Sequence, residues 1–139
     1  MYTLKTEHSF DAAHFLYGYE GKCSNIHGHR WRVVLEVSGE ELTDEGQMRG
    51  MLIDFGDLKK DLKEEVDYLD HCLIMEKGSL KETTLAALES ENFRILQFEF
   101  RPTAENMAKY FYDKMQDRGY TVKEVTVHET PNNAATYSR

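Results

Sequence analysis

The strongest constraint on the fold is an alternating run over residues 29–37, HRWRVVLEV. Successive side chains of a β-strand point to opposite faces, so such a run buries one face of a strand and leaves the other in contact with solvent. Every second residue of the run, starting at His29, is aromatic or apolar. Residues 2–10 alternate in the same way, though less regularly. We therefore predict two strands, each with one buried face.

Two later segments have the spacing of amphipathic helices. Residues 55–69 place apolar side chains three and four positions apart with charged residues between them, and Asp54 is a suitable N-cap. Residues 104–117 repeat this pattern after Thr103, a second N-cap candidate, and before Gly119, a helix-stop residue. We expect both helices to cover the same face of a sheet.

The rest of the chain is predicted as follows. Residues 121–129 read as a last strand with Val125 on one face and Val122 on the other, and residues 11–26 as a long surface loop. Between the helices, 79–90 fits a short helix and 94–100 an additional strand. We predict one α+β domain over residues 1–139, with an antiparallel sheet and helices on one face.

Composition excludes several classes of protein. The chain has 139 residues and a net charge of −8, which argues against nonspecific nucleic-acid binding, because that needs a basic surface. No apolar run approaches the length of a membrane span, and the first residues do not form a signal-peptide core. The two cysteines are too few for a disulfide framework. We expect a cytoplasmic protein that binds no membrane.

Three histidines are candidates for a metal site. His27 and His29, separated by one glycine, project to the same side of an extended backbone, which is the apolar side of the predicted strand. His14 joins them if the first two strands pair. Three imidazoles with an open fourth position are typical of catalytic zinc, whereas structural zinc has four protein ligands. The alternative is that these are ordinary histidines at a strand start.

Cys23 lies four residues before His27, and two interpretations stay open. It is either the fourth ligand of a closed site or a free thiol beside an open site, where a nearby metal lowers a thiol pKa and yields a base or nucleophile. Cys72 is most simply a small buried residue.

Carboxylates supply the remaining candidates. Asp70 and His71 form the usual orienting pair for acid–base chemistry, but neighbours on a helix do not face each other. The pair therefore cooperates only if it lies in a loop or if each residue serves the site separately. Glu129 is either a solvated strand end or a carboxylate that accepts two parallel N–H bonds from a ring such as guanine or a pterin. Glu105 is most simply a favourable charge at a helix N-terminus.

Taken together, six segments resemble the 6-pyruvoyl-tetrahydropterin synthase family. They are Phe10-x-Ala12-Ala13-His14, Cys23-x-x-x-His27-Gly28-His29, Ile53-Asp54-Phe55, Leu69-Asp70-His71, Pro102-Thr103-Ala104-Glu105-Asn106 and Glu129-Thr130. The short spacing from the cysteine to the first histidine is similar to that of the 6-carboxy-tetrahydropterin synthases of queuosine and 7-deazaguanine biosynthesis. Pyruvoyl-forming members generally have more residues there.

The resemblance implies a tunnelling fold assembled as a hexamer of two trimers, with active sites between subunits. It implies a lyase that converts 7,8-dihydroneopterin triphosphate to 6-carboxy-tetrahydropterin, acetaldehyde and triphosphate. The implied residues are zinc ligands His14, His27 and His29, catalytic thiolate Cys23, proton relay Asp70 and His71 from a neighbouring subunit, pterin anchor Glu129, and pterin-pocket residues Thr103 and Glu105.

The chain departs from the family pattern in two places. The family commonly has Leu-Asn or Leu-Asp shortly after the Asp-His pair, where this chain has Cys72-Leu73-Ile74-Met75, so a polar loop cap is missing. Segment 76–100 is longer than in compact members. The alternatives are the pyruvoyl-forming activity and a non-catalytic zinc-stapled binding module. The triphosphate-binding residues stay unassigned among Lys22, Arg30, Arg32 and Arg101, each of which is more simply a surface charge.

Overall fold

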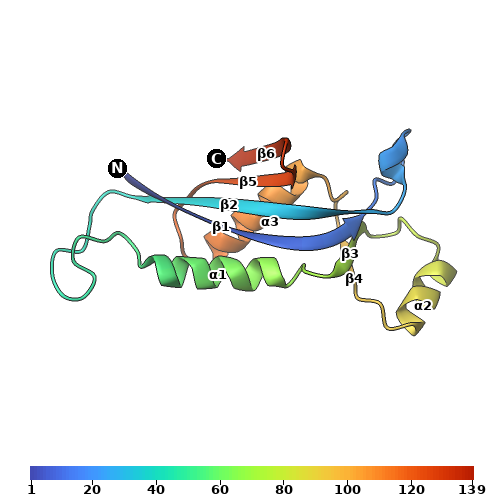
Figure 1. Ribbon diagram of the computed structural model, residues 1–139, viewed down its shortest axis with the longest axis horizontal. Helices are drawn as coiled ribbons and strands as arrows, with labels where there is room; N and C mark the ends of the chain where they lie inside the picture. The colour runs from blue at the N-terminus through green and yellow to red at the C-terminus, as the bar shows by residue number, and fades with distance from the viewer.

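The computed structural model describes all 139 residues and contains one six-stranded sheet, ordered β4-β3-β1-β2-β5-β6 (Figure 1). The strands are β1 (Tyr2–His14), β2 (His27–Gly39), β3 (Cys72–Glu76), β4 (Ile95–Phe98), β5 (Val122–Thr130) and β6 (Asn133–Ser138). The helices are α1 (Phe55–Asp67), α2 (Glu82–Ser90) and α3 (Ala104–Asp117), with a 3-10 turn η1 (Lys22–Ser24) between β1 and β2. None of the helices is long and apolar enough to cross a membrane.

The antiparallel ladder of β1 and β2 is the centre of the sheet. It pairs the two strands along their whole length, from Tyr2 opposite Gly39 to His14 opposite His27. Alternate side chains enter the core, and Phe10 and Trp31 are fully buried and stack at 5.8 Å between ring centroids. The predicted pairing of these strands is confirmed, although β1 runs four residues further than expected and shortens the loop.

Helices α1 and α3 pack on the same face of the sheet and enclose one apolar core with it (Figure 1). Both predicted N-caps are confirmed: Asp54 accepts a hydrogen bond from the Gly56 N–H at 2.6 Å, and Thr103 accepts one from the Asn106 N–H at 3.2 Å. Gly119 follows α3 with a φ of 98°, a conformation that favours glycine.

Three expectations about the sheet are wrong or incomplete. The sheet is mixed, because β3 runs parallel to both β1 and β4. Strands β3 and β6 were not predicted. Val122 is buried like Val125, because the β2–β5 register shifts between Glu36 and Val37 and returns Val122 to the core face.

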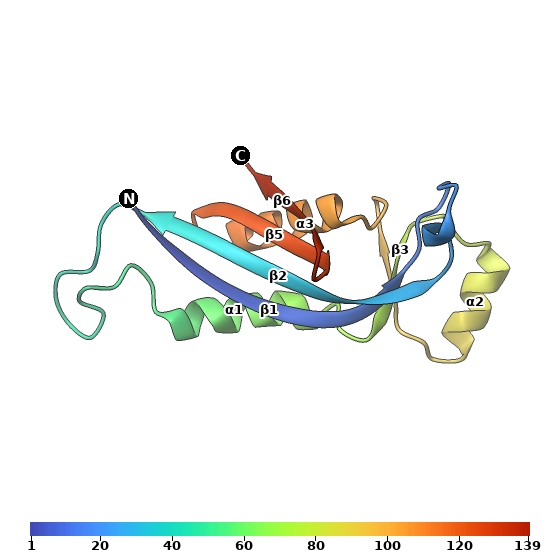
Figure 2. The ribbon, with the colours of Figure 1, turned by 45° about the horizontal axis from the view of Figure 1, so that its top comes forward.

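The segment from β3 to β4 forms an arm that carries α2. The predicted short helix and additional strand are confirmed as α2 and β4. No residue of α2 is buried, and both views show it beyond the end of the sheet, away from α1 and α3 (Figures 1 and 2). Helix α2 therefore lies outside the core.

Candidate active site

Three histidines meet where the core face of the sheet ends. His14 is the last residue of β1, and His27 and His29 lie at the start of β2. One ring nitrogen from each lies within 4.8 Å of the others, and the ring centroids are 4.6 to 5.1 Å apart. The side chains share the face of Trp31 because residues two apart on a strand point the same way. The structure thus brings together the three predicted metal ligands.

Backbone carbonyls orient two of these rings. His14 Nδ1 lies 2.8 Å from the carbonyl oxygen of Pro102, and His27 Nδ1 lies 2.7 Å from that of Asn25. A carbonyl only accepts, so it fixes the proton on Nδ1 and leaves Nε2 free to bind a metal. The Asn106 side-chain amide donates to the Arg101 carbonyl at 2.9 Å and braces the bend that presents Pro102.

The inward nitrogens fit a metal ion. Nε2 of both His14 and His29 is buried and has no hydrogen-bond partner, an arrangement that is unfavourable unless another ligand is present. Burial, reinforced by the neighbouring rings, lowers the pKa of His14 to about 4 against the effect of the Pro102 carbonyl. Burial also lowers the pKa of His29. These two imidazoles are therefore neutral near pH 7, as metal binding requires, and a set of three histidines suits Zn²⁺.

Glu129 lies beside the cluster. Its two carboxylate oxygens are 3.5 Å from His29 Nε2 and 3.8 Å from His14 Nε2. It also lines a hollow of about 420 Å³ together with Glu105. Thr103 is not among the residues of this hollow, since its hydroxyl caps α3. Glu129 thus connects the histidines with an opening large enough for a small molecule.

Asp70 and His71 lie in a turn after α1, not on the helix. His71 has a φ of 59°, and its Nδ1 is 2.9 Å from Asp70 Oδ2, so the two neighbours do face each other. Asp11 holds the turn from β1: its N–H donates to Asp70 Oδ1 at 2.8 Å, and its carbonyl accepts the His71 N–H at 2.7 Å. The Asp11 N–H, assisted by His71, lowers the pKa of Asp70. The predicted pair is therefore formed within one chain.

The two cysteines differ in environment. Cys23 is a half-buried free thiol in η1, and it is not part of the group of converging metal donors. This geometry favours the open three-histidine site over the closed site with four protein ligands. Cys72 is buried, and burial raises its pKa to about 11.

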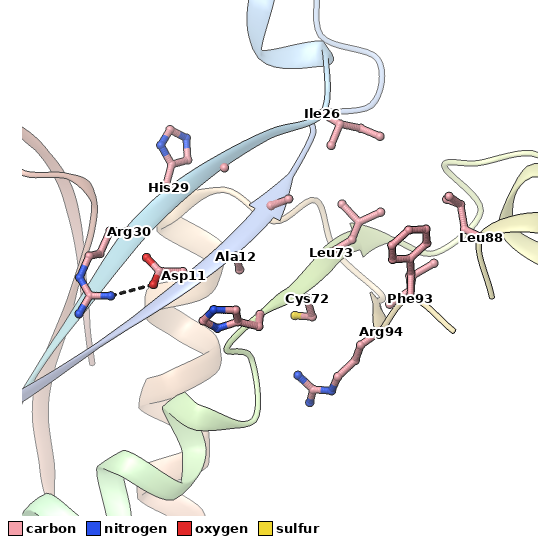
Figure 3. Close-up of a pocket in the computed structure, with 14 residues that line it drawn as sticks. Asp11, Ala12, Ile26, His29, Arg30, Cys72, Leu73, Leu88, Phe93 and Arg94 are labelled. Carbon is pink, nitrogen blue, oxygen red and sulfur yellow. Dashed lines mark hydrogen bonds and ion pairs between the residues drawn. The ribbon is translucent and has the colours of Figure 1, made fainter. Parts of the chain in front are cut away.

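A larger cavity connects the site with the arm. It has a volume of about 710 Å³ and is bordered by both His29 and His71 (Figure 3). The arm side is apolar and includes Leu73, Leu88 and Phe93, whereas Asp11 and Arg30 form an ion pair at 2.9 Å on the β1–β2 side. The histidine cluster and the Asp70–His71 turn therefore each contribute a residue to the lining of one cavity.

Comparison with known proteins identifies the family of the chain. Residues 3–139 match the model of the family described as 6-pyruvoyl tetrahydropterin synthase. The chain belongs to this family. It is 34% identical over 140 residues to the 6-carboxy-5,6,7,8-tetrahydropterin synthase of Haemophilus influenzae, covering 99% of both chains. It is 33% identical to the enzyme of that name from Synechocystis, covering 99% of this chain and 93% of the relative.

The fold is that of the pterin synthases. The structure of 6-pyruvoyl tetrahydropterin synthase from Caenorhabditis elegans superposes with a TM-score of 0.70 at 25% identity, covering 99% of this chain and 95% of that one. The α+β tunnelling fold expected from the sequence is therefore confirmed, with the mixed sheet as the correction.

Sequence reasoning about this family member missed several groups that build the site. Asp11 occupies the unassigned position of the Phe10-x-Ala12 motif, and its backbone and not its side chain holds Asp70. The carbonyls of Asn25 and Pro102 orient metal donors, but a carbonyl acceptor carries no residue-type signal. Among these groups, only Asp11 could have been found from the sequence, because it lies inside the motif that runs from Phe10 to His14.

Proposed function

We propose that the protein is a zinc-dependent 6-carboxy-5,6,7,8-tetrahydropterin synthase. It converts 7,8-dihydroneopterin triphosphate and water to 6-carboxy-tetrahydropterin, acetaldehyde and triphosphate, and serves queuosine or 7-deazaguanine biosynthesis in the cytoplasm. The observation that carries the proposal is the convergence of three imidazoles, one buried and two half-buried, beside Glu129. The names of the two relatives and the short spacing from Cys23 to His27 support the carboxy-forming product.

Substrate binding is assigned to carboxylates and histidines. His14, His27 and His29 would hold Zn²⁺, which as a Lewis acid polarises oxygens of a bound substrate. Glu129 can accept two parallel N–H bonds from the amino-pyrimidine edge of a pterin, and it is placed for this at the rim of the hollow that Glu105 also lines.

Proton transfer is assigned to Cys23 and to the Asp70–His71 pair. Cys23 acts as thiolate base on the substrate side chain. Asp70 accepts a hydrogen bond from His71 Nδ1 and thereby orients Nε2 of the ring toward the reacting group. The His71 side chain is 76% exposed, which suits a group that completes its site against a neighbouring subunit.

The proposed assembly is a hexamer of two trimers. The edge strand β6 supports it, because residues 133–138, NAATYS, carry no charge and leave one side of the strand unpaired. Natural edge strands usually carry charges, prolines or bulges that prevent pairing, so an uncharged edge fits a partner strand. Analytical ultracentrifugation of the purified protein would measure the assembly.

A product assay tests the activity. Purified zinc-loaded protein is incubated with 7,8-dihydroneopterin triphosphate, and acetaldehyde is captured as a hydrazone while the pterin is identified by mass. We expect equimolar acetaldehyde and 6-carboxy-tetrahydropterin. A pyruvoyl product without acetaldehyde would contradict the assignment and indicate the sister activity of the family.

A variant of the thiol excludes the structural-zinc alternative. We expect Cys23→Ala to stay folded, keep equimolar zinc and lose product formation. Loss of zinc together with unfolding would instead indicate a closed structural site, since such zinc contributes directly to folding.

A further inference from the structure

The end of α1 has carbonyls that the helix itself does not satisfy. The last carbonyls of any α-helix lack intrahelical donors and carry partial negative charge. Helix α1 has no basic residue in its last turn. Three of the five carbonyls from Val66 to Asp70 find donors in the turn itself. The Val66 carbonyl accepts the Leu69 N–H at 3.0 Å, the Asp67 carbonyl accepts the Asp70 N–H at 3.1 Å, and the Leu69 carbonyl accepts the Cys72 thiol at 3.0 Å. Two carbonyls, those of Tyr68 and Asp70, need a donor from elsewhere.

Arg94 supplies both donors. Its guanidinium donates from Nη1 to the Asp70 carbonyl at 3.2 Å and from Nη2 to the Tyr68 carbonyl. The same group lies over the Tyr68 ring, 5.1 Å from the centroid. The backbone carbonyl of Arg94 also accepts the Leu73 N–H at 3.1 Å. One residue therefore contacts the Asp70–His71 turn on both of its sides.

The arm brings Arg94 to this place (Figure 3). After α2 the chain reverses at Asn92, whose φ is 65°, and enters β4, where Ile95 pairs with Leu73. Arg94 directly precedes this pairing and so lies next to the turn. The polar loop cap that the sequence lacks after His71 is thus replaced by an arginine from the longer segment between β3 and β4.

We infer that Arg94 is a positioning residue for the Asp70–His71 pair, an inference that rests on the proposed role of this pair in proton transfer. The planar guanidinium fork fixes the carbonyls of Tyr68 and Asp70, two positions apart, and so holds the backbone between them and the left-handed conformation of His71 that follows. A lysine has a single ammonium point and cannot hold both carbonyls in the same geometry.

The test compares Arg94→Ala and Arg94→Lys with wild type in the zinc-loaded oligomer, using acetaldehyde release. We expect kcat to fall about 10-fold or more in Arg94→Ala, since small misplacements of catalytic groups cost up to about 100-fold, and to recover partly in Arg94→Lys. KM and zinc content should stay within about twofold, because the Arg94 guanidinium donates to backbone carbonyls of the turn and is not part of the group of metal donors. Arg49→Ala is the matched control, an exposed arginine that forms no side-chain hydrogen bond.

Two outcomes would overturn the inference. One is an unchanged kcat in folded, zinc-loaded Arg94→Ala. The other is a raised KM at unchanged kcat, which would make Arg94 a substrate-binding residue. If wild type itself releases no acetaldehyde, the proposed function fails, and hydrogen exchange then tests Arg94 independently. Exchange of the amide protons of residues 68–73 should accelerate in Arg94→Ala and not in Arg49→Ala, while unchanged exchange would contradict the positioning role.

Discussion

The two histidine groups of this protein are built in opposite ways. His14 is 1% exposed and belongs to a cluster fixed by strand register, whereas His71 is 76% exposed and belongs to a turn fixed by hydrogen bonds from other segments. Burial lowers the pKa of His14 and of His29 in the first group, which favours the neutral imidazoles that metal binding needs. Exposure leaves the second group free to meet a ligand or another subunit. Strand register alone therefore forms the first group, whereas the second group depends on hydrogen bonds from distant segments and stays open to a ligand or a second subunit.

The largest expected effect concerns the buried cluster. His14→Ala removes one of the three proposed zinc donors. Substituting a residue that only supports a metal ligand lowers metal affinity by up to roughly 100-fold, so we expect a larger loss of zinc affinity here. We also expect complete loss of product formation. Metal content after dialysis, measured by atomic emission, checks this. His8→Ala is the control, because the His8 side chain lies outside the cluster and forms its hydrogen bond with Asp67. Equimolar zinc in His14→Ala would show that the cluster is not the metal site.

The next largest effect is a difference in alkylation rate between Cys23, which precedes His27 in the sequence, and Cys72, which follows His71. Cys72 is buried with a pKa of about 11, so its thiolate fraction at pH 8 is only about 0.001, and its alkylation should be at least about 100-fold slower than that of Cys23. Its rate should rise about tenfold per pH unit up to about pH 11, since the thiolate is the reactive form. Peptide mass spectrometry after iodoacetamide treatment measures both sites. Equal labelling would mean that the His71 turn opens readily, and Cys23→Ser confirms the assignment of the fast site.

A smaller effect is expected from the hydrogen bond of Asn106 that supports the orientation of His14. Asn106→Ala removes the amide that braces the bend at Arg101 and Pro102, so His14 loses a fixed acceptor for Nδ1. We expect zinc affinity to weaken about 10-fold, the lower end of the range for such supporting contacts. Competition with a chromogenic chelator gives the affinity. The exposed Asn132→Ala serves as control, and equal affinities in the two variants would show that the bend does not orient His14.

The smallest effect concerns the exposed pair. Because the folded-state pKa of Asp70 lies below its ordinary value of 3.8, its contribution to stability is fully present above that pH and is lost as pH falls through the lowered pKa. Asp70 is 36% exposed, so solvent screening limits the contribution to under about 1 kcal/mol. Urea unfolding between pH 3 and 7 should show a shallower acid loss in Asp70→Asn. If the free energy of unfolding falls with pH equally steeply in wild type and in Asp70→Asn, the Asp11 N–H does not favour the ionised form of Asp70.

The same comparison explains how far sequence reasoning reached. The cluster was predictable because strand parity places His27 and His29 with Trp31, and pairing of two strands adds His14. The caps Asp54 and Thr103 were predictable because their residue types serve one local purpose.

The rest depends on contacts between distant segments. β3 is a short apolar run without alternation, which is typical of parallel strands and cannot be distinguished locally from a helix. β6 shows only a weak alternation, with Ala135 and Tyr137 as its half-buried residues, and Val122 changes face only because a register shift intervenes. Arg94 contacts the carbonyls of residues 68 and 70, which carry no signal in their side chains.

All three metal donors belong to the hairpin of β1 and β2, so the first 29 residues contain the complete donor set. The carbonyl that orients His14 comes 88 residues later, and Glu129 later still. A nascent chain therefore has the donors long before it has the groups that orient and cover them. In the proposed zinc enzyme, metal binding and docking of the C-terminal half would stabilise each other, because a ligand that binds only the assembled state favours assembly. A bound metal would then couple the folding of the first strands to that of the last.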